Sequence, residues 1–414
     1  MRMDRLLETT NNGTLQTGIG KPNLLEVLAS IYYMGCFLLT NVSWGKVVML
    51  ALLCMMILVY LQSENGVFHI EIQWFHVFLL LFLIISLLSA IWAKNASDTI
   101  SRCKSLLEIL VSTMILYLVF DCGNQVERLL RAMMWAGVIG ALILTIYYGR
   151  GNLLVLLQSG DRLNGQLWNV NTLARMMTTS VLLMFYFTLY HGWRWKYLLV
   201  LPSVLIMITA QSRTAIAALV GGMTALILLR LLSGQKKSRR KNVFSILLII
   251  AVVYVAFRSG LADGNLERID GVVSIFSGRG KVDSSAHKRL ELIRAGLQQF
   301  LITPLFGIGL NNAHYLAISA VGSDYYLHNN YVELLAGVGL VGTVCFYAVY
   351  MRLAAGFLRF RSRKDVCLPA CAALLTTQLL MEMGSVSYYK KDVYFVLVVC
   401  ILELKQLQQM ENVK

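Results

Sequence analysis

A histidine opens the stretch of this chain that is best suited to chemistry, His328 to Thr343, which reads HNNYVELLAGVGLVGT. The segment before it, residues 259–327, is too polar to span a membrane, and the stretch itself becomes apolar within a few residues. An imidazole therefore stands where a polar loop meets a membrane-spanning segment. Ionisable groups in that setting are candidates for a functional site, and histidine changes its charge near neutral pH.

Long apolar runs make up most of the remaining chain. Of the 414 residues, 57% are hydrophobic and only 14% are charged, whereas soluble proteins carry about 25% charged residues. The runs have the length of about 20 residues that crosses a bilayer as a helix, and they lack the alternation of membrane strands. We therefore predict an all-α, polytopic membrane protein with about twelve transmembrane helices and one large loop that contains an amphipathic helix. The predicted spans are 22–40, 44–62, 73–93, 105–121, 127–148, 170–190, 194–210, 213–232, 242–258, 329–351, 367–386 and 390–405.

Clusters of Lys and Arg predict the orientation of these spans. The most basic connections, residues 230–241 and 352–364, fall on one side of the membrane in a twelve-span count. Cytoplasmic loops accumulate such residues, so both termini are expected in the cytoplasm. The same bias explains the net charge of +15 without a nucleic-acid partner. The expected regions are a cytoplasmic N-terminal tail (1–21), helices one to nine (22–258), a large extracytoplasmic loop (259–328), helices ten to twelve (329–405) and a cytoplasmic C-terminal tail (406–414).

Several cations fall in loops that this topology places outside, against the usual bias. Arg213 follows a tight turn and opens a helix, whose first turn attracts anions. Lys288 and Arg289 open a stretch, residues 287–301, with the spacing of an amphipathic helix. Arginine suits phosphate because its planar fork donates two hydrogen bonds, although an arginine that reaches lipid headgroups is the alternative. The outward cations are Arg150, Arg162, Arg213, Arg268, Arg279, Lys288, Arg289, Arg294, Lys390 and Lys391.

Four motifs follow one another between residues 160 and 345. They are GDRLNGQLWNVNTLA with Arg162, Gly165 and Asn171; QSRT with Arg213; Arg289 followed by PLFGIGLNN at 304–312; and the stretch with His328, Asn329, Gly339, Gly342 and Thr343. In this order and spacing they resemble the core of the O-antigen ligase and Wzy-type polysaccharide polymerase superfamily. The first five predicted spans and the last two agree with that family only in hydropathy.

The resemblance implies a glycosyltransferase of the bacterial plasma membrane, with an active site that faces the periplasm or the cell exterior. Its donor would be a glycan on undecaprenyl diphosphate, and its acceptor a hydroxyl of another glycan or of an envelope component. The lipid bilayer would surround it, and a chain-length regulator is a further candidate partner. In this family the reaction is thought to invert the anomeric carbon and to need no metal and no other cofactor.

Candidate residues for this chemistry are present. We expect His328 to act as general base on the acceptor hydroxyl, and Arg213 and Arg289 to stabilise the leaving diphosphate. The sequence shows no outward Asp-x-Asp or paired carboxylates that would hold a metal. Glu333 either orients the imidazole or packs within the helix bundle. The expected substrate-binding residues are Arg162, Asn171, Gln211, Ser212, Lys288, Asn311, Asn312, Tyr325, Tyr326, Asn329 and Glu333.

Two activities within the superfamily stay open, together with one function from another class. The histidine motif favours a ligase, which transfers the glycan to lipid A core or another envelope acceptor. The composition, rich in Lys, Met and Cys and poor in Pro, is typical of Gram-positive exopolysaccharide or capsule producers and favours a polymerase, which we prefer. A flippase for lipid-linked sugars is the third reading; it predicts mid-helix charges, inverted repeats and broken helices, and the sequence shows few such charges and no repeat.

Overall fold

The computed structural model describes residues 23–39, 42–63, 71–121, 125–159, 163, 168–192, 195–232, 284–361 and 367–412. Every regular element within these residues is a helix. They are α2 (Leu24–Leu38), α3 (Gly45–Ser63), α4 (Trp74–Leu88), η1 (Ser89–Ile91), α5 (Ala96–Phe120), α6 (Gln125–Tyr148), α7 (Arg150–Ser159), α8 (Val170–His191), η2 (Trp195–Val200), α9 (Leu201–Thr209), α10 (Arg213–Leu232), α13 (Ser284–Ile302), α14 (His314–Val321), α15 (Asn330–Arg359), α16 (Cys367–Glu382) and α17 (Lys391–Asn412).

Eight helices in the described residues are long and apolar enough to span a membrane. They are α3, α4, α5, α6, α8, α10, α15 and α17. Three shorter apolar helices, α2, α9 and α16, occupy three further predicted spans. The predicted span 242–258 lies outside the described residues, as does the N-terminal tail 1–21, whereas residues 406–412 of the predicted C-terminal tail belong to α17. The all-helical character is thus confirmed for the described residues, and these helices are consistent with a polytopic membrane protein. The number of twelve spans stays a prediction.

Several helix boundaries differ from the sequence prediction for local reasons. α5 begins nine residues before the predicted start, because the side chain of Asn95 accepts a hydrogen bond from the Ser97 N–H (3.0 Å) and caps the helix. α15 and α17 continue past their apolar segments to Arg359 and Asn412. A hydropathy pattern marks only the part of a helix that suits the bilayer core, so polar helix ends escape it. α7 lies within the predicted loop 149–169.

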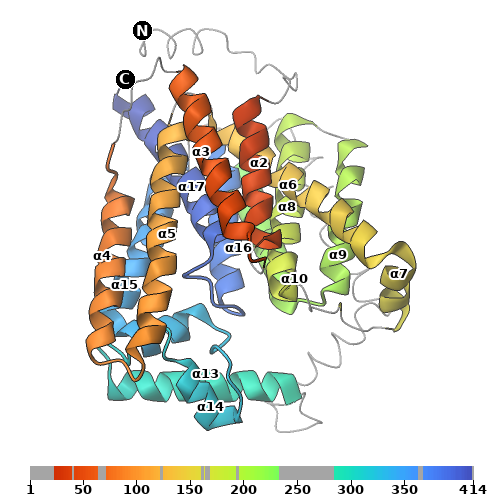
Figure 1. The fold of residues 1–414 in the computed structure, drawn as a ribbon. Helices are drawn as coiled ribbons and strands as arrows, with labels where there is room; N and C mark the ends of the chain where they lie inside the picture. The colour runs from red at the N-terminus through yellow and green to blue at the C-terminus, as the bar shows by residue number, and fades with distance from the viewer. Residues whose placement is uncertain are drawn as a thin grey trace.

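α8 forms the centre of the helix bundle. The 18-residue apolar stretch of α8 that could span a membrane is 94% buried, whereas the corresponding stretches of α3 and α4 are each 33% buried. α8 contacts α6, α9, α10 and α16, and α3 and α4 lie at the periphery (Figure 1). Exposed leucines and isoleucines on α4 mark a surface that suits lipid contact.

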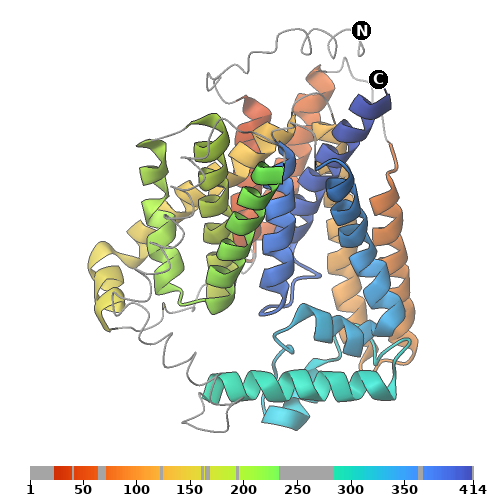
Figure 2. The same ribbon diagram turned by 180° about the vertical axis from the view of Figure 1, so that it is seen from behind.

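α13 and α14 form a platform across one end of the bundle, opposite the end of α17 (Figures 1 and 2). α13 lies across the end of the bundle, whereas α4, α5 and α10 run along its length (Figure 1). It extends the amphipathic helix predicted at residues 287–301 by a few residues, and it buries Leu292 against α14 and the start of α15. We call this end the platform end; α10 and α15 begin there (Figure 2).

A break in α15 joins the platform to the bundle. Gly339 has φ 63° and ψ −165°, so the helix is interrupted there. The free backbone groups pair with the loop after α13: Leu340 N donates to Pro304 O (2.8 Å), and Gly309 N donates to Gly337 O (2.8 Å). Irregular backbone is tolerated at membrane depth where protein covers it. The sequence predicted one uninterrupted span from 329 to 351, and this break is a correction to it.

Candidate functional site

Three residues carry an unusual backbone conformation at the platform end. Among the described residues, the non-glycine positions with positive φ are Gln211 (48°), Asn311 (63°) and His328 (54°). This left-handed region is strained for side chains with a Cβ, and such strain concentrates at functional sites. All three positions were singled out from the sequence. Their shared conformation supports a functional reading of these turns.

Aromatic rings surround His328, which precedes α15 and is half-buried. Its ring centroid lies 4.2 Å from that of Tyr326 and 6.1 Å from that of Tyr325. The Glu333 carboxylate accepts a hydrogen bond from the Leu327 N–H (2.8 Å), which fixes the backbone just before the histidine. The side chain of Asn329 caps the start of α15, because it accepts a hydrogen bond from Val332 N (3.1 Å).

A polar cavity has Tyr326 among its lining residues. Its volume is about 50 Å³, enough for several water-sized groups. It lies between the start of α8, the segment before α15 and the α16–α17 connection. Its lining residues are Asn169, Asn171, Thr172, Arg175, Tyr326, Ser385, Val386, Tyr389 and Lys390.

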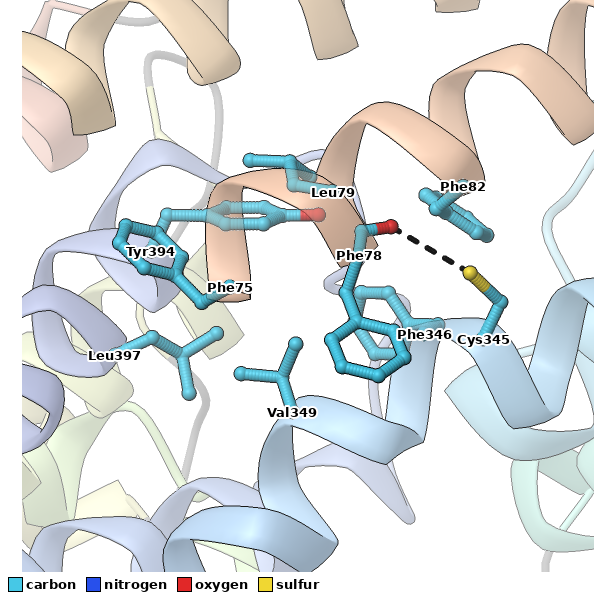
Figure 3. A pocket seen from close by; sticks show the side chains of 9 residues that line it. All are labelled: Phe75, Phe78, Leu79, Phe82, Cys345, Phe346, Val349, Tyr394 and Leu397. Carbon is cyan, nitrogen blue, oxygen red and sulfur yellow. Dashed lines mark hydrogen bonds between the residues drawn. The ribbon is translucent and has the colours of Figure 1, made fainter. Parts of the chain in front are cut away.

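A second cavity lies between α4, α15 and α17 and differs in character (Figure 3). It holds about 20 Å³, and aromatic and aliphatic side chains line it, with Cys345 donating to the Phe78 carbonyl oxygen (3.4 Å). It offers few polar groups to orient a ligand. We therefore place the candidate site at the polar cavity.

Two cations line the polar cavity. Arg175 is 3% exposed and pairs with Asp392 (Nη1–Oδ2 3.1 Å). Lys390 is half-buried; burial, and then the neighbouring charge of Arg175, lowers the pKa of its ammonium group to about 8. A lysine with a depressed pKa in a cavity is a candidate functional group.

A third cation, Arg102 of α5, holds the cavity wall in place. Its guanidinium donates from Nε (3.1 Å) and Nη2 (2.8 Å) to the amide oxygen of Asn311. It also lies 3.8 Å from the centroid of the Tyr389 ring. One side chain thus connects α5, the PLFGIGLNN loop and the α16–α17 connection.

The second asparagine of that loop, Asn312, is fully buried and bound by protein. Its oxygen accepts from Asn95 N (2.8 Å), and its NH₂ group donates to the Thr99 hydroxyl (2.9 Å) and to Leu310 O (3.1 Å). These bonds fasten the loop to the start of α5. The geometry therefore favours an anchoring role for Asn312 over the predicted contact with substrate.

The remaining predicted residues lie on other elements of the platform end. Gln211 and Ser212 are buried in the turn before α10, and Arg213 is the first residue of α10. Lys288 is exposed and Arg289 half-buried in the first turns of α13. Arg162 lies outside the described residues.

The sequence interpretation did not name seven of the nine lining residues as site residues: Asn169, Thr172, Arg175, Ser385, Val386, Tyr389 and Lys390. Lys390 appeared only among the outward cations, and Arg175 is a charge within the apolar run predicted as the span 170–190. A charge within an apolar run is the sequence signal that could have marked Arg175, whereas its ion pair with Asp392 on another helix is visible only in the structure. Tyr389 and the role of Arg102 depend on contacts between distant segments, for which the sequence gives no local sign.

A comparison with protein families bears on the class of this protein. Residues 197–347 match the family model described as O-antigen ligase. The chain carries an O-antigen ligase domain. This match confirms the resemblance and supports membership of the O-antigen ligase/polymerase superfamily. At family level it supports a membrane glycosyltransferase of the ligase/polymerase type. A comparison with curated proteins gives no match.

The O-antigen ligase domain contains part of the candidate site. Arg213, Arg289, the PLFGIGLNN loop and His328 lie within the matched residues. Arg102, Arg175 and Lys390 lie outside them and reach the site through the fold.

Proposed function

We propose that this protein is a polysaccharide polymerase. It transfers a glycan from undecaprenyl diphosphate to a hydroxyl of a second lipid-linked glycan, on the outer face of the bacterial plasma membrane. The observation that carries the proposal is the position of His328, a strained histidine whose aromatic neighbour Tyr326 also lines a cavity with two cations.

In the proposed step His328 acts as general base. It accepts the proton of the acceptor hydroxyl while that oxygen attacks the anomeric carbon of the donor. The bond from this carbon to the diphosphate oxygen breaks, and undecaprenyl diphosphate leaves with the electron pair. Attack from the face opposite the leaving group inverts the anomeric carbon. A positioned base of this kind contributes about 10²–10⁴-fold to the rate.

The leaving diphosphate gains charge in this step, and the proposal assigns cations to meet it. Arg213 at the start of α10 and Arg289 on the platform are the proposed ligands. Lys390 and Arg175 in the cavity wall are additional ones. Fixed cations in a partly buried site stabilise developing charge more than water does, and this electrostatic stabilisation makes the proposed reaction independent of metal.

Ligase activity is the second candidate, because the matched family model is described as O-antigen ligase. The chemistry at the anomeric carbon would be unchanged, and only the acceptor would differ.

The test is transfer by the purified protein in liposomes with EDTA, using lipid-linked oligosaccharide from the native strain. A ladder of longer lipid-linked products supports a polymerase. Transfer only after cell-envelope acceptors are added supports the ligase instead. Absence of transfer with either acceptor, in a protein that moves lipid-linked sugar across the bilayer, would overturn both and favour a flippase.

A further inference from the structure

Three charged side chains meet where α3, α5 and α17 come together. Lys46 Nζ lies 2.8 Å from one oxygen of Glu108, and Lys391 Nζ lies 3.2 Å from the other. Two cations share one carboxylate, so the cluster has a net positive charge. The reaction proposed above uses none of these residues.

The cluster lies deep along the membrane-spanning length of α5. Glu108 comes twelve residues after Ala96, the first residue of α5, which is about 18 Å along the helix axis. Lys46 and Lys391 belong to the first turns of α3 and α17, and α3 begins well short of the platform (Figure 1). Ionisable groups at such depth are rare in membrane proteins and mark substrate or ion pathways.

The surface around the cluster is apolar and exposed. Val47, next to Lys46, is 68% exposed, and Leu107, next to Glu108, is 51% exposed. The side chain of Lys46 itself is 74% exposed. Exposed leucine and valine on membrane-spanning helices face lipid. The lysine at this surface is therefore accessible from the bilayer.

The cluster is next in sequence to a residue of the polar cavity. Lys391 directly follows Lys390, which lines the cavity beside Arg175. The first turns of α3 and α17 add the partial positive charge of two helix ends near Glu108. An anion held by Lys46 and Lys391 would thus lie one residue along the chain from a cation of the cavity wall.

From this arrangement we propose that the cluster of Lys46, Glu108 and Lys391 is the docking site for the diphosphate of a polyprenyl-linked substrate that enters from the bilayer. The inference rests on the proposed function, since that function supplies the lipid. Glu108 holds the two ammonium groups together while the site is empty. The diphosphate then replaces the carboxylate and accepts hydrogen bonds from both lysines; no covalent bond changes.

The test measures binding of undecaprenyl diphosphate without a glycan to the full-length protein in nanodiscs, by native mass spectrometry. Undecaprenol, phosphatidylglycerol and inorganic diphosphate are the comparison probes. Lys46→Gln and Lys391→Gln are each expected to weaken binding of undecaprenyl diphosphate about tenfold, the loss of one charge-assisted hydrogen bond. Arg361→Gln removes a charge from an exposed residue just beyond the far end of α15 and is the matched control, expected to bind as wild type.

Glu108→Gln distinguishes a cluster that binds diphosphate from an ion-pair cluster that only joins three helices. If the cluster binds diphosphate, this variant frees both lysines and raises the affinity for undecaprenyl diphosphate. If the cluster only joins three helices, the variant lowers the thermal unfolding midpoint and leaves the affinity unchanged, which overturns the proposal. Equal binding of phosphatidylglycerol overturns it too, because the site would then be a general contact for anionic lipid. Inorganic diphosphate that competes as well as the lipid would show that the polyprenyl chain plays no part, and would overturn it as well.

The readout is independent of glycan transfer. Lysine variants that bind undecaprenyl diphosphate as tightly as wild type, in a protein that still transfers glycan, would refute the docking site alone. If the lysine variants bind undecaprenyl diphosphate more weakly but the wild-type protein transfers no glycan, the docking site stands and the proposed function alone is refuted.

Discussion

The ring of Tyr326 lies 4.2 Å from the ring of His328 and at the same time forms part of the wall of the polar cavity. One aromatic side chain is thus shared by the surroundings of the proposed base and by the cavity that contains Arg175 and Lys390. Tyr326→Ala is expected to lower the rate of glycan transfer by about tenfold or more, because packing against the imidazole is lost. Tyr326→Phe keeps the ring and should retain most of the rate. A Phe variant as impaired as the Ala variant would show that the hydroxyl matters and the ring does not. Initial rates of product formation decide between them.

The ammonium group of Lys390 predicts a pH dependence on the alkaline side. Burial lowers its pKa to about 8, so the group is charged below pH 8 and neutral above it. If the charge binds diphosphate, the KM for the donor should rise about tenfold between pH 7 and pH 9. Lys390→Arg keeps its charge over this range and should flatten the profile. A wild-type KM that stays constant to pH 9, or an Arg variant with the wild-type slope, would contradict this role.

The buried amide of Asn312 predicts a loss of stability. Asn312→Ala leaves the Asn95 N–H and the Thr99 hydroxyl without their partner, which costs about 3 kcal/mol in the free energy of unfolding. We expect a lower thermal unfolding midpoint in detergent. Asn171→Ala, at the half-buried wall of the cavity, is the comparison and should lower transfer more than stability. If Asn312→Ala unfolds like wild type but no longer binds donor, the amide contacts substrate after all.

Gly339 and Gly337 form a matched pair in the broken part of α15. Gly339 has φ 63°, and a Cβ there would collide with the backbone of Leu305. A Cβ on Gly337 would meet its nearest atom, Gly309 O, at an ordinary 3.5 Å. Gly339→Ala should therefore reduce the monodisperse fraction in size-exclusion chromatography, since it strains the backbone and separates the loop from the helix. Gly337→Ala should behave nearly as wild type, and equal losses in both would argue against the role of the break.

The sequence predicted the elements that depend on local pattern. Apolar runs located the described spanning helices, and the spacing of apolar residues after His287 located α13. Such signals are local because hydropathy and helical periodicity are properties of neighbouring residues. These signals do not reveal the part of a helix that continues with polar residues, as at the C-terminal end of α17.

The assembly of the site depended on contacts that local pattern does not contain. The break at Gly339 exists because a loop about thirty residues earlier supplies its hydrogen-bond partners. Arg102 and Asn311 are likewise joined across 209 positions. The resemblance to a known family grouped His328, Arg213 and Arg289 as candidate catalytic residues. Their catalytic roles stay predictions.

The most direct test of the central claim is glycan transfer by His328→Ala in liposomes with EDTA, beside wild type and His287→Ala. His287 lies exposed on the platform, where it pairs with Glu291, and controls for the loss of a histidine as such. The proposed general base predicts that His328→Ala loses about 10²-fold or more of the rate while still binding donor, and that His287→Ala transfers like wild type. Full transfer by a folded His328→Ala protein would show that another group, or none, removes the proton.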